Sequence, residues 1–434
     1  MNNHELLQRS LHAVWHPCTQ MKAHETLPLI PIRRGEGVWL EDFDGNRYLD
    51  AISSWWVNLF GHNNARIKQA IRNQLDQLEH VILAGFTHEP VVQLSERLSA
   101  LSGLGHCSYA SDGASATEIA LKMSFHYWRN LGQHEKNQFI SLQNGYHGET
   151  IGALSVTDVA LFKDTYSPLL RASVQLPTPD WRLAREGESA EEHALQCAKQ
   201  LEDYVAQHHG AIAALILEPL IQCAAGMAMH HPIYVTRARE ICSKYQVHLI
   251  ADEIAVGFGR TSTLFACEQA RVTPDFLCLS KGISGGYLPL SVTLTTEDVY
   301  QAFYDESTTR GFLHSHSYTG NALACSAALA TLDIFAEEAV LEQNLLKAEY
   351  LNCGLQSFTD LPIRNLRNTG MIWAFEVETQ QSAFARDFYA AALKQGVLLR
   401  PIGNTVYFMP PYVITNDEID HLLAQTRKLL EMYA

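Results

Sequence analysis

The sequence predicts an α/β protein with a large domain built on a mostly parallel sheet and a smaller C-terminal α+β domain. A chain of 434 residues is too long for one simple hydrophobic core and favours at least two domains. The middle of the chain alternates short apolar runs with helix-like segments, which is typical of strand–helix–strand units. The apolar runs are rich in Val, Ile and Leu without polar alternation, and they predict strands covered on both faces at 106–111, 138–143, 211–219, 247–254, 275–282 and 290–296.

The two ends of the chain differ in pattern from the middle. In residues 330–434, two long helical stretches flank segments that resemble short strands. The N-terminal segment is irregular apart from a predicted hairpin at 37–50, whose turn is Asp44-Gly45-Asn46. We therefore expect an N-terminal segment that packs with the small domain, a large domain and a small C-terminal domain, over 1–55, 56–329 and 330–434.

Charge and cysteine content restrict the partners and the compartment. The formal net charge is −15, so the surface repels phosphate backbones and nucleic acid is not an expected partner. The 9 cysteines are dispersed without C-x-x-C or zinc-like spacing, which indicates reduced thiols in the cytoplasm and no metal site. The N-terminus lacks a secretory pattern, and no apolar run approaches the ~20 residues of a membrane helix. We expect a cytoplasmic protein with small-molecule ligands and no membrane partner.

The strongest chemical signal is an acid and a lysine at the ends of consecutive apolar runs. Asp252 ends the run in IADEIAVGFGR, and Lys281 ends the next one in LCLSKGISGG. Ligands of open α/β sheets bind beyond the carboxyl ends of the strands, so the two side chains can hold opposite sides of one planar cofactor. A lysine amine forms an imine with an aldehyde, and a carboxylate keeps a pyridine nitrogen protonated. A helix cap or a solvated loop explains either residue alone, whereas the pair indicates pyridoxal 5′-phosphate (PLP) chemistry.

Two further segments can complete such a site. In SDGASATE, 111–118, Gly113 allows close approach of the backbone, and the following helix N-terminus offers N–H groups to a phosphate. Helix capping explains the same residues when they are taken alone. Tyr146, in NGYHGET directly after a predicted strand, can stack on a cofactor ring or pack on the core, and the sequence favours neither.

Competing motifs are weak or absent. GFGRTS breaks the dinucleotide pattern G-x-G-x-x-G at Ser262, and the zinc-protease, nucleophile-elbow and P-loop patterns do not occur. The 20 histidines are dispersed, and the HHG and HHP pairs are more typical of surface residues than of metal ligands.

These motifs resemble the class III (ω) aminotransferases, which have the PLP-dependent transferase fold type I. The resemblance covers nearly the whole chain and includes DEIAVGFGRT, the downstream S-K-G, NGYHG and SYTGNALAC. WHPCTQM, SSWW, THEP and LLRPIGNTVYFMPPY resemble the branch of this family that works in biotin biosynthesis. The reaction implied is transamination of 8-amino-7-oxononanoate to 7,8-diaminononanoate, with S-adenosylmethionine as the amino donor.

The resemblance implies cofactor contacts for the matching residues. Lys281 would be the Schiff-base lysine, and Asp252 would hold the pyridine nitrogen. Tyr146 would stack near the ring and face the substrate. Gly113 and Ala114 would donate backbone N–H groups to the phosphate.

The resemblance also implies substrate contacts and a homodimer with shared active sites. Ser317, in HSHSYTGN, would reach the phosphate of the cofactor in the other subunit, and Ser315 would contact substrate. Trp55 would wall the substrate channel, although core packing of the Trp-Trp pair is a plain alternative. Arg400 would bind the terminal carboxylate of the substrate, because a planar fork suits a carboxylate, and Tyr407 would lie beside it. A salt bridge to a local carboxylate is the alternative for Arg400.

The chain departs from the family pattern at three places. Cys18 stands where many members carry Tyr, His316-Ser317 where many carry Pro-Thr, and Val256 where Thr is usual. The Cys18 change bears on the donor, because aromatic rings can hold the sulfonium of S-adenosylmethionine and some relatives use lysine instead.

Three rival functions stay open at this point. One is another ω-aminotransferase acting on ornithine or 4-aminobutyrate, which would be expected to lack SSWW and MPPY. The second is a fold-type I aminomutase, which would turn over without a second substrate. The third is a PLP-binding regulator, for which the chain has little room for a DNA-binding module and an unsuitable charge.

Overall fold

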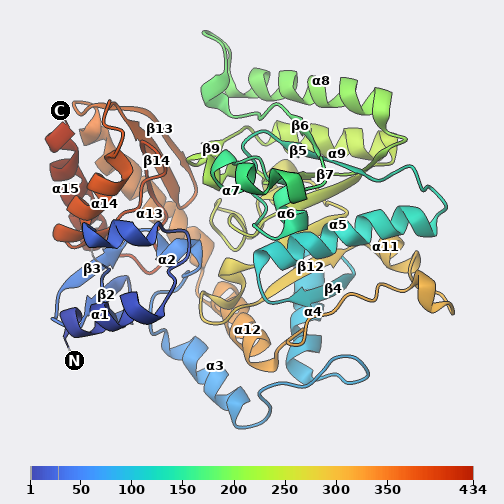
Figure 1. Cartoon of the computed structure of the whole chain (residues 1–434), viewed down its shortest axis with the longest axis horizontal. Coiled ribbons are helices and arrows are strands. Elements are labelled where there is room, and N and C mark those ends of the chain that lie inside the picture. The colour runs from blue at the N-terminus through green and yellow to red at the C-terminus, as the bar shows by residue number, and fades with distance from the viewer. Residues whose placement is uncertain (1, 28, 434) are drawn as a thin grey trace. The chain divides into compact units, whose positions relative to one another are not determined.

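The computed structural model describes residues 2–27 and 29–433, which form two compact units (Figure 1). The smaller unit contains the chain up to Ala65, Leu346–Leu366 and the chain from Trp373 onward. The larger unit contains Arg66–Leu345 and Arg367–Ile372. The division of the chain at 55/56 and 329/330 stays a prediction.

The larger unit is built on a 7-stranded sheet with the order β4–β12–β11–β10–β7–β5–β6. Its strands are β4 (His106–Ala110), β5 (Gln138–Leu142), β6 (Val174–Leu176), β7 (Ile212–Leu217), β10 (His248–Asp252), β11 (Phe276–Leu279) and β12 (Ser291–Thr295). The strands β6, β5, β7, β10 and β11 are parallel, and β12 is antiparallel to both of its neighbours. Strand β4 therefore has the same direction as the parallel strands. The loops that follow β4, β5, β7, β10 and β11 all leave from one edge of the sheet.

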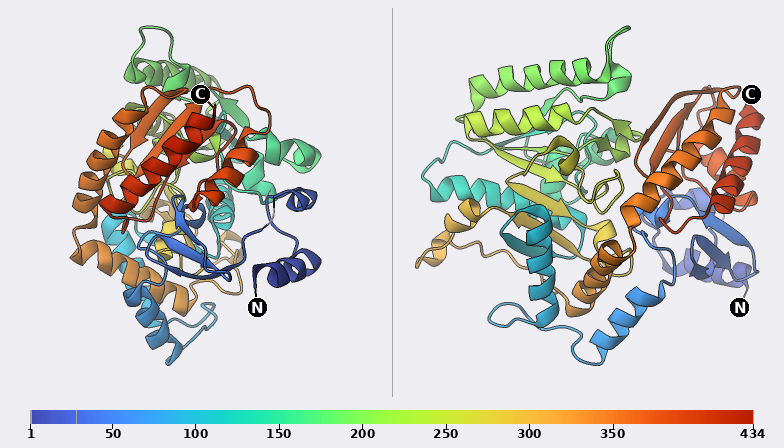
Figure 2. Two further views of the ribbon diagram at one scale, coloured as in Figure 1. Left: turned by 90° about the vertical axis from the view of Figure 1, so that its left-hand side faces the viewer. Right: turned by 180° about the vertical axis from the view of Figure 1, so that it is seen from behind.

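Helices cover both faces of this sheet (Figures 1 and 2). Helix α5 (Gly113–Asn130) packs against the central strands, while α8 (Ala190–His208) and α9 (Ile233–Tyr245) pack on each other and α9 packs on β10. Strands β7, β10, β11 and β12 are buried along their whole length, which explains their lack of polar alternation. The other helices and strands of the larger unit are α3 (Ala65–Leu75), α4 (Glu89–Ser102), α6 (Ile151–Val156), α7 (Ala160–Lys163), β8 (Ile221–Gln222), β9 (Ala228–Met229), α10 (Cys267–Ala270), α11 (Glu297–Gln301) and α12 (Ala322–Glu337). Helix α13 (Val340–Leu355) begins in the larger unit, and most of its residues belong to the smaller one.

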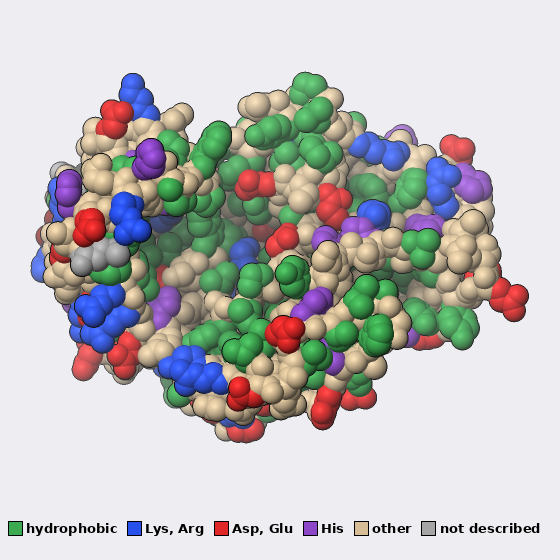
Figure 3. All heavy atoms as spheres, turned by 60° about the horizontal axis from the view of Figure 1, so that its bottom comes forward, with side chains coloured by type: hydrophobic (Ala, Val, Ile, Leu, Met, Phe, Trp, Pro, Cys, Tyr) green, Lys and Arg blue, Asp and Glu red, His purple; other side chains and the backbone are tan. Residues whose placement is uncertain are grey.

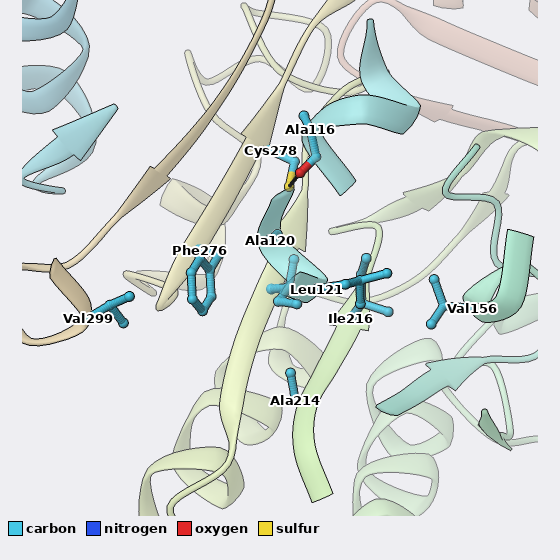
Figure 4. Close-up of a cluster of buried hydrophobic side chains, with 10 residues drawn as sticks. Ala116, Ala120, Leu121, Val156, Ala214, Ile216, Phe276, Cys278 and Val299 are labelled. Atoms are coloured by element: carbon cyan, nitrogen blue, oxygen red, sulfur yellow. Dashed lines mark hydrogen bonds between the residues drawn. The ribbon is translucent and has the colours of Figure 1, made fainter. Parts of the chain in front are cut away.

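A buried apolar cluster joins α5 to the sheet (Figure 4). Small residues of the helix, Ala116 and Ala120, are fully buried against strand residues such as Ile216 and Phe276. The carbonyl of Ala116 also accepts a hydrogen bond from Oγ1 of Thr293 at 2.8 Å. Close packing of the first turns of α5 fixes its N-terminus at the sheet edge from which the loops leave.

The smaller unit joins segments from both ends of the chain, which lie side by side in Figure 2 (blue and red). Strand β15 (Val397–Leu398) pairs in parallel with β3 (Arg47–Asp50), in a sheet with the order β1–β2–β3–β15. Strands β2 (Trp39–Asp42) and β3 form the predicted hairpin, because the Asp42 carboxylate accepts the N–H groups of Asp44 and Asn46 across the turn. The remaining elements are α1 (Asn3–Ala13), β1 (Ile32–Glu36), α2 (Ser53–Trp56), β13 (Ile363–Thr369), β14 (Ile372–Val377), α14 (Phe384–Lys394), β16 (Thr405–Phe408) and α15 (Asn416–Leu430).

The structure also shows how charged side chains are distributed on the surface and whether the cysteines form disulfides. Acidic and basic side chains are interspersed on the face shown in Figure 3. The cysteines are free thiols, and seven of them are buried or half-buried. Across residues 2–27 and 29–433, no helix has the length and apolar character needed to cross a bilayer.

Candidate active site

Three ionisable side chains meet at the sheet edge of the larger unit. Asp252 is the last residue of β10, Glu218 follows the last residue of β7, and Lys281 lies two residues beyond β11. Strand β10 is parallel to both β7 and β11, with Asp252 opposite Cys278. Adjacent parallel strands that end together bring their following residues into one place. The sequence predicted this arrangement for Asp252 and Lys281.

The carboxylate of Asp252 is buried and held on both oxygens. Oδ1 accepts the N–H of Ile254 at 3.1 Å, and Oδ2 lies 2.7 Å from Nδ1 of His147. The side chains of Asp252 and His147 are 4% and 1% exposed. A buried carboxylate held at two points has one orientation, and each oxygen keeps a further lone pair for a ligand.

Lys281 has a strained backbone conformation, and its buried position disfavours the charged form of its amine. Its φ of +46° lies in the left-handed region, which is uncommon for a residue with a Cβ and typical of functional sites. Desolvation by burial lowers the pKa of Lys281, while Cys223, Asp252 and Glu218 act in the opposite direction. A lysine with a lowered pKa has more of its amine in the neutral form, which is the nucleophilic and basic form.

Glu218 secures the loop that carries Tyr146. Its oxygens accept the N–H groups of Tyr146 at 2.9 Å and Cys223 at 3.1 Å. Burial raises the pKa of Glu218 to about 7, with a further increase from Asp252 and an opposing effect of His147. The half-buried Tyr146 donates its hydroxyl to Glu149 at 2.8 Å and packs edge-on against Phe162.

The loop after β4 approaches the Tyr146 loop closely. Asp112 caps α5 by accepting the N–H of Ser115 at 3.0 Å, and its carbonyl accepts the N–H of Ala116. Among residues 2–27 and 29–433, the N–H groups of Gly113 and Ala114 have no hydrogen-bond acceptor. A Cβ on Gly148 would lie 2.5 Å from the Cβ of Ala114, and a Cβ on Gly113 would lie 2.8 Å from Ile254. Glycine at both positions therefore lets three loops of this edge pack together.

These groups fit PLP. The cofactor needs an amine for its aldehyde, a carboxylate for its ring nitrogen and N–H donors for its phosphate. Lys281, Asp252 and the free N–H groups at the start of α5 are of these types, and all follow strands that end at the same edge. In the part of the chain that the structure describes, no cluster of His, Cys, Asp and Glu is arranged for a metal ion.

In the smaller unit, the SSWW segment forms a left-handed turn. Ser53, Ser54, Trp55 and Trp56 have φ values of 51°, 46°, 74° and 72°. Each such residue costs ~1–2 kcal/mol, so the turn requires support from its surroundings. Ser54 donates its N–H and hydroxyl to the buried Asp50 at 2.9 and 2.7 Å, and Ser53 donates to the carbonyl of Met409 at 2.7 Å.

The turn places the two tryptophans in different environments. Trp56 is buried and donates its Nε1–H to the hydroxyl of Tyr407 at 3.1 Å. Trp55 is 43% exposed, and the guanidinium of Arg400 lies 4.8 Å from its ring centre. Arg400 also donates to the carbonyl of Cys18 at 3.5 Å and borders a pocket of about 480 Å³ that Cys18 and Tyr389 also line. The structure thus gives Arg400 an aromatic and a carbonyl neighbour, and no ion pair joins it to a carboxylate within the described ranges.

The expected roles of Ser315, Ser317 and Tyr407 stay predictions. Ser315 and Ser317 are exposed in the loop before α12, where the carbonyl of Ser317 contacts His80 at 2.8 Å. Tyr407 is buried against Trp56, and its proximity to Arg400 stays a prediction.

Two residues at the edge were not identified from the sequence. Glu218 follows a fully apolar run, which is the pattern that identified Asp252, so this signal could have been used. His147 is part of NGYHGET, but no local pattern links it to a residue 105 positions later.

The chain is similar to known proteins over almost its whole length. Residues 20–430 match the sequence model of the aminotransferase class-III family. The adenosylmethionine-8-amino-7-oxononanoate aminotransferase of Helicobacter pylori is 48% identical over 429 residues, 97% of this chain and 96% of the relative. The crystal structure of the enzyme of that name from Methanocaldococcus jannaschii has a TM-score of 0.93 at 35% identity and covers 100% of both chains. An amine transaminase from an uncultivated Pseudomonas species, crystallised in its PLP-bound form, has a TM-score of 0.91 at 32% identity and covers 97% of this chain and 99% of its own.

The fold, the acid–lysine pair at the sheet edge and these similarities agree with one another. The chain belongs to the class III aminotransferases, enzymes of PLP-dependent transferase fold type I that use pyridoxal 5′-phosphate as their cofactor.

Proposed function

We propose that this enzyme transfers an amine to the ketone of 8-amino-7-oxononanoate, giving 7,8-diaminononanoate in biotin biosynthesis, with S-adenosylmethionine as the amino donor. The names of the relatives from Helicobacter pylori and Methanocaldococcus jannaschii support the substrate. The observation that carries the chemistry is the placement of Asp252 and Lys281 at the ends of adjacent parallel strands.

The residues of the larger unit would divide the work on the cofactor. When bound, PLP supplies an aldehyde that exchanges amines and a ring that withdraws electrons from the substrate. Lys281 would be the Schiff-base residue, and its neutral amine would act as base and acid toward the Cα proton of the substrate. Asp252 would hold the ring nitrogen in its protonated form, and the N–H groups of Gly113 and Ala114 would bind the phosphate. Tyr146 would lie near the ring and contact the substrate.

The residues of the smaller unit would select the substrate. Arg400 binds the terminal carboxylate of 8-amino-7-oxononanoate, because its guanidinium is already oriented by the ring of Trp55 and has no carboxylate partner within the described ranges. Trp55 contributes an exposed apolar face to an aliphatic substrate, and Tyr407 supports the turn through Trp56. Ser315 contacts substrate.

The choice of donor depends on how a sulfonium is held. Cys18 provides no aromatic ring, but Trp55 and Tyr146 both present partly exposed rings that can attract a sulfonium. We therefore favour S-adenosylmethionine over lysine as the donor.

The enzyme would act as a cytoplasmic homodimer. Free thiols throughout the chain support a reducing compartment. The exposed loop that carries Ser317 supports a dimer in which this hydroxyl reaches the cofactor phosphate in the other subunit.

The visible absorbance spectrum of the purified protein tests the proposal. Titration with S-adenosylmethionine alone should remove the yellow band of the lysine-bound cofactor, and subsequent 8-amino-7-oxononanoate should restore it. Loss of the band with lysine and not with S-adenosylmethionine would change the donor and keep the mechanism. Loss with ornithine alone would replace the biotin-pathway function with that of another ω-aminotransferase, and the absence of a yellow band would remove the PLP chemistry.

A further inference from the structure

The short helix α6 is capped by a side chain from another helix. It begins directly after the loop that carries Tyr146, and its cap residue Thr150 makes no side-chain hydrogen bond to the helix. The half-buried Glu118, in the second turn of α5, supplies the cap instead. Its Oε1 accepts the N–H of Gly152 at 2.7 Å, the N–H of Ala153 at 3.2 Å and the hydroxyl of Thr150 at 2.6 Å. The first N–H groups of a helix have no acceptor within the helix, so this carboxylate stabilises the start of α6.

Glycine at position 152 gives the carboxylate room to approach. A Cβ at Gly152 would lie 2.7 Å from Oε1 of Glu118 and closer still to Oε2. Gly152 has no positive φ and lies within α6, where alanine is otherwise the better helix former. The glycine therefore serves the contact with Glu118 and not an unusual backbone conformation.

Helix α6 in turn holds the loop 144–149. The backbone N–H of His147 donates to Oγ1 of Thr157, directly after the last residue of α6, at 2.9 Å. The hydroxyl of Tyr146 donates to Glu149, the residue before the cap, at 2.8 Å. The loop is thus bonded to the far end of α6 and closed on itself near the start of the helix, so a displacement of α6 moves Tyr146.

The same face of α5 contacts both the loop and α6 (Figure 1). Ala114 lies four residues before Glu118, a spacing that places both on one side of the helix. A Cβ on Gly148 of the loop would lie 2.5 Å from the Cβ of Ala114. Because the N–H groups of Gly113 and Ala114 are the expected phosphate donors, α5 joins the phosphate site to the segment that carries Tyr146.

We propose that Glu118 is a positioning residue for Tyr146: it caps α6 from α5 and thereby fixes the ring of Tyr146 relative to the phosphate-binding turn at Gly113 and Ala114. The proposal rests on the proposed function, which supplies the roles of Tyr146 and of this turn. Glu118 itself would touch neither substrate nor cofactor.

Three substitutions and one control isolate the cap. Glu118→Ala removes the acceptor, Glu118→Gln keeps an oxygen acceptor of the same reach, and Gly152→Ala displaces the carboxylate with a Cβ. The control is Glu192→Ala, which removes a comparable carboxylate cap at the start of α8, where Glu192 accepts the N–H of Ser189 at 2.8 Å. Helix α8 carries no proposed site residue.

The first measurement is amide hydrogen exchange of the apoprotein, followed in peptides that cover 144–157. Glu118→Ala should increase the exchange rate of this segment by about tenfold, as loss of a helix cap does, and Glu118→Gln should stay within about threefold of the wild type. Glu192→Ala should change the exchange of α8 and leave 144–157 as in the wild type.

The second measurement asks whether Glu118 acts through Tyr146. It compares the dissociation constant of PLP and the rate of the half-reaction with the amino donor that removes the yellow band from the wild type. Glu118→Ala should lower this rate by about tenfold in the presence of Tyr146 and by less than about twofold in a Tyr146→Leu background, because coupled residues give non-additive effects. Gly152→Ala should lower the rate in the wild type and have little effect in a Glu118→Ala background.

The outcomes that overturn the inference differ from those that overturn the proposed function. Additive losses in Glu118→Ala and Tyr146→Leu, with reduced stability alone in Glu118→Ala and Glu192→Ala alike, would show a merely structural cap. If Glu118→Ala does not fold, unchanged exchange and rate in Gly152→Ala would refute the positioning role. Wild-type protein that does not bind PLP would overturn the proposed function, and with it the role assigned to Tyr146, whatever the exchange of 144–157.

Discussion

His248 should make the folded protein sensitive to acid. It is the first residue of β10, is 6% exposed, and its ring lies 4.6 Å from Tyr127, 4.7 Å from Trp128 and 5.3 Å from Phe276. Its Nδ1 is 2.9 Å from the hydroxyl of Ser124. Burial lowers the pKa of His248 from 6.5 to about 4, and Asp275 opposes this change.

The sign and size of the effect follow from proton binding. Between pH 6.5 and 4 the unfolded chain binds a proton at this histidine and the folded protein does not, so the free energy of unfolding falls as the pH is lowered. The decrease in the pKa of His248 by roughly 2.5, at ~1.4 kcal/mol for each pKa unit, corresponds to about 3.5 kcal/mol of unfolding free energy. This contribution is fully present above about pH 6.5 and is lost once the pH has fallen through about 4.

The assay compares urea unfolding of the wild type and His248→Asn between pH 7.5 and 4, at one protein concentration. Asn keeps a polar group near Ser124 and does not titrate. The difference in unfolding free energy between the two proteins should decrease by ~2 kcal/mol between pH 7.5 and 5. His134→Asn, at an exposed histidine, is the control and should follow the wild type. Parallel pH curves for the wild type and His248→Asn would refute the reasoning.

Three further predictions concern the site. Lys281→Ala should abolish turnover and leave at most a cofactor that gel filtration removes; full activity would contradict its central role. Arg400→Ala should raise the KM for 8-amino-7-oxononanoate by about tenfold or more while the donor half-reaction changes little, and equal losses in both would show a structural role. Gly148→Ala should lower the free energy of unfolding by at least ~2 kcal/mol and weaken PLP binding, because the new Cβ would lie 2.5 Å from the Cβ of Ala114. Gly187→Ala is the matched control: it also has a positive φ, but open space around it, so a similar loss of PLP binding there would exclude the clash as the cause.

The positions of Asp252 and Lys281 could be predicted from the sequence because their signal is local. Asp252 and Lys281 each end an apolar run, and strands that are buried on both faces must be apolar along their length. The hairpin at 37–50 could also be predicted from the sequence, since Asp44-Gly45-Asn46 is a turn signal between two strand-like segments. The site edge itself followed from the general rule for open α/β sheets.

Other features of the site depend on contacts between distant segments. The sequence has no signal for the pairing of residues 47–50 with 397–398, or for the position of β12 between β4 and β11. The left-handed turn at Ser53–Trp56 opposes the backbone preference of all four of its residues, and Asp50 and Met409 maintain it.

The sequence by itself determined the fold class and the PLP chemistry, because buried strands must be apolar along their length and because Asp252 and Lys281 stand where two such strands end. Only the tertiary structure decided the surroundings of the site residues: which carboxylate His147 contacts, which N–H groups Glu218 accepts, and which ring the Arg400 guanidinium faces. These contacts join residues that are distant in sequence, and they form only when packing of the strands and loops brings them together. Burial then shifts pKa values such as those of Lys281 and Glu218, which composition alone leaves at their ordinary values.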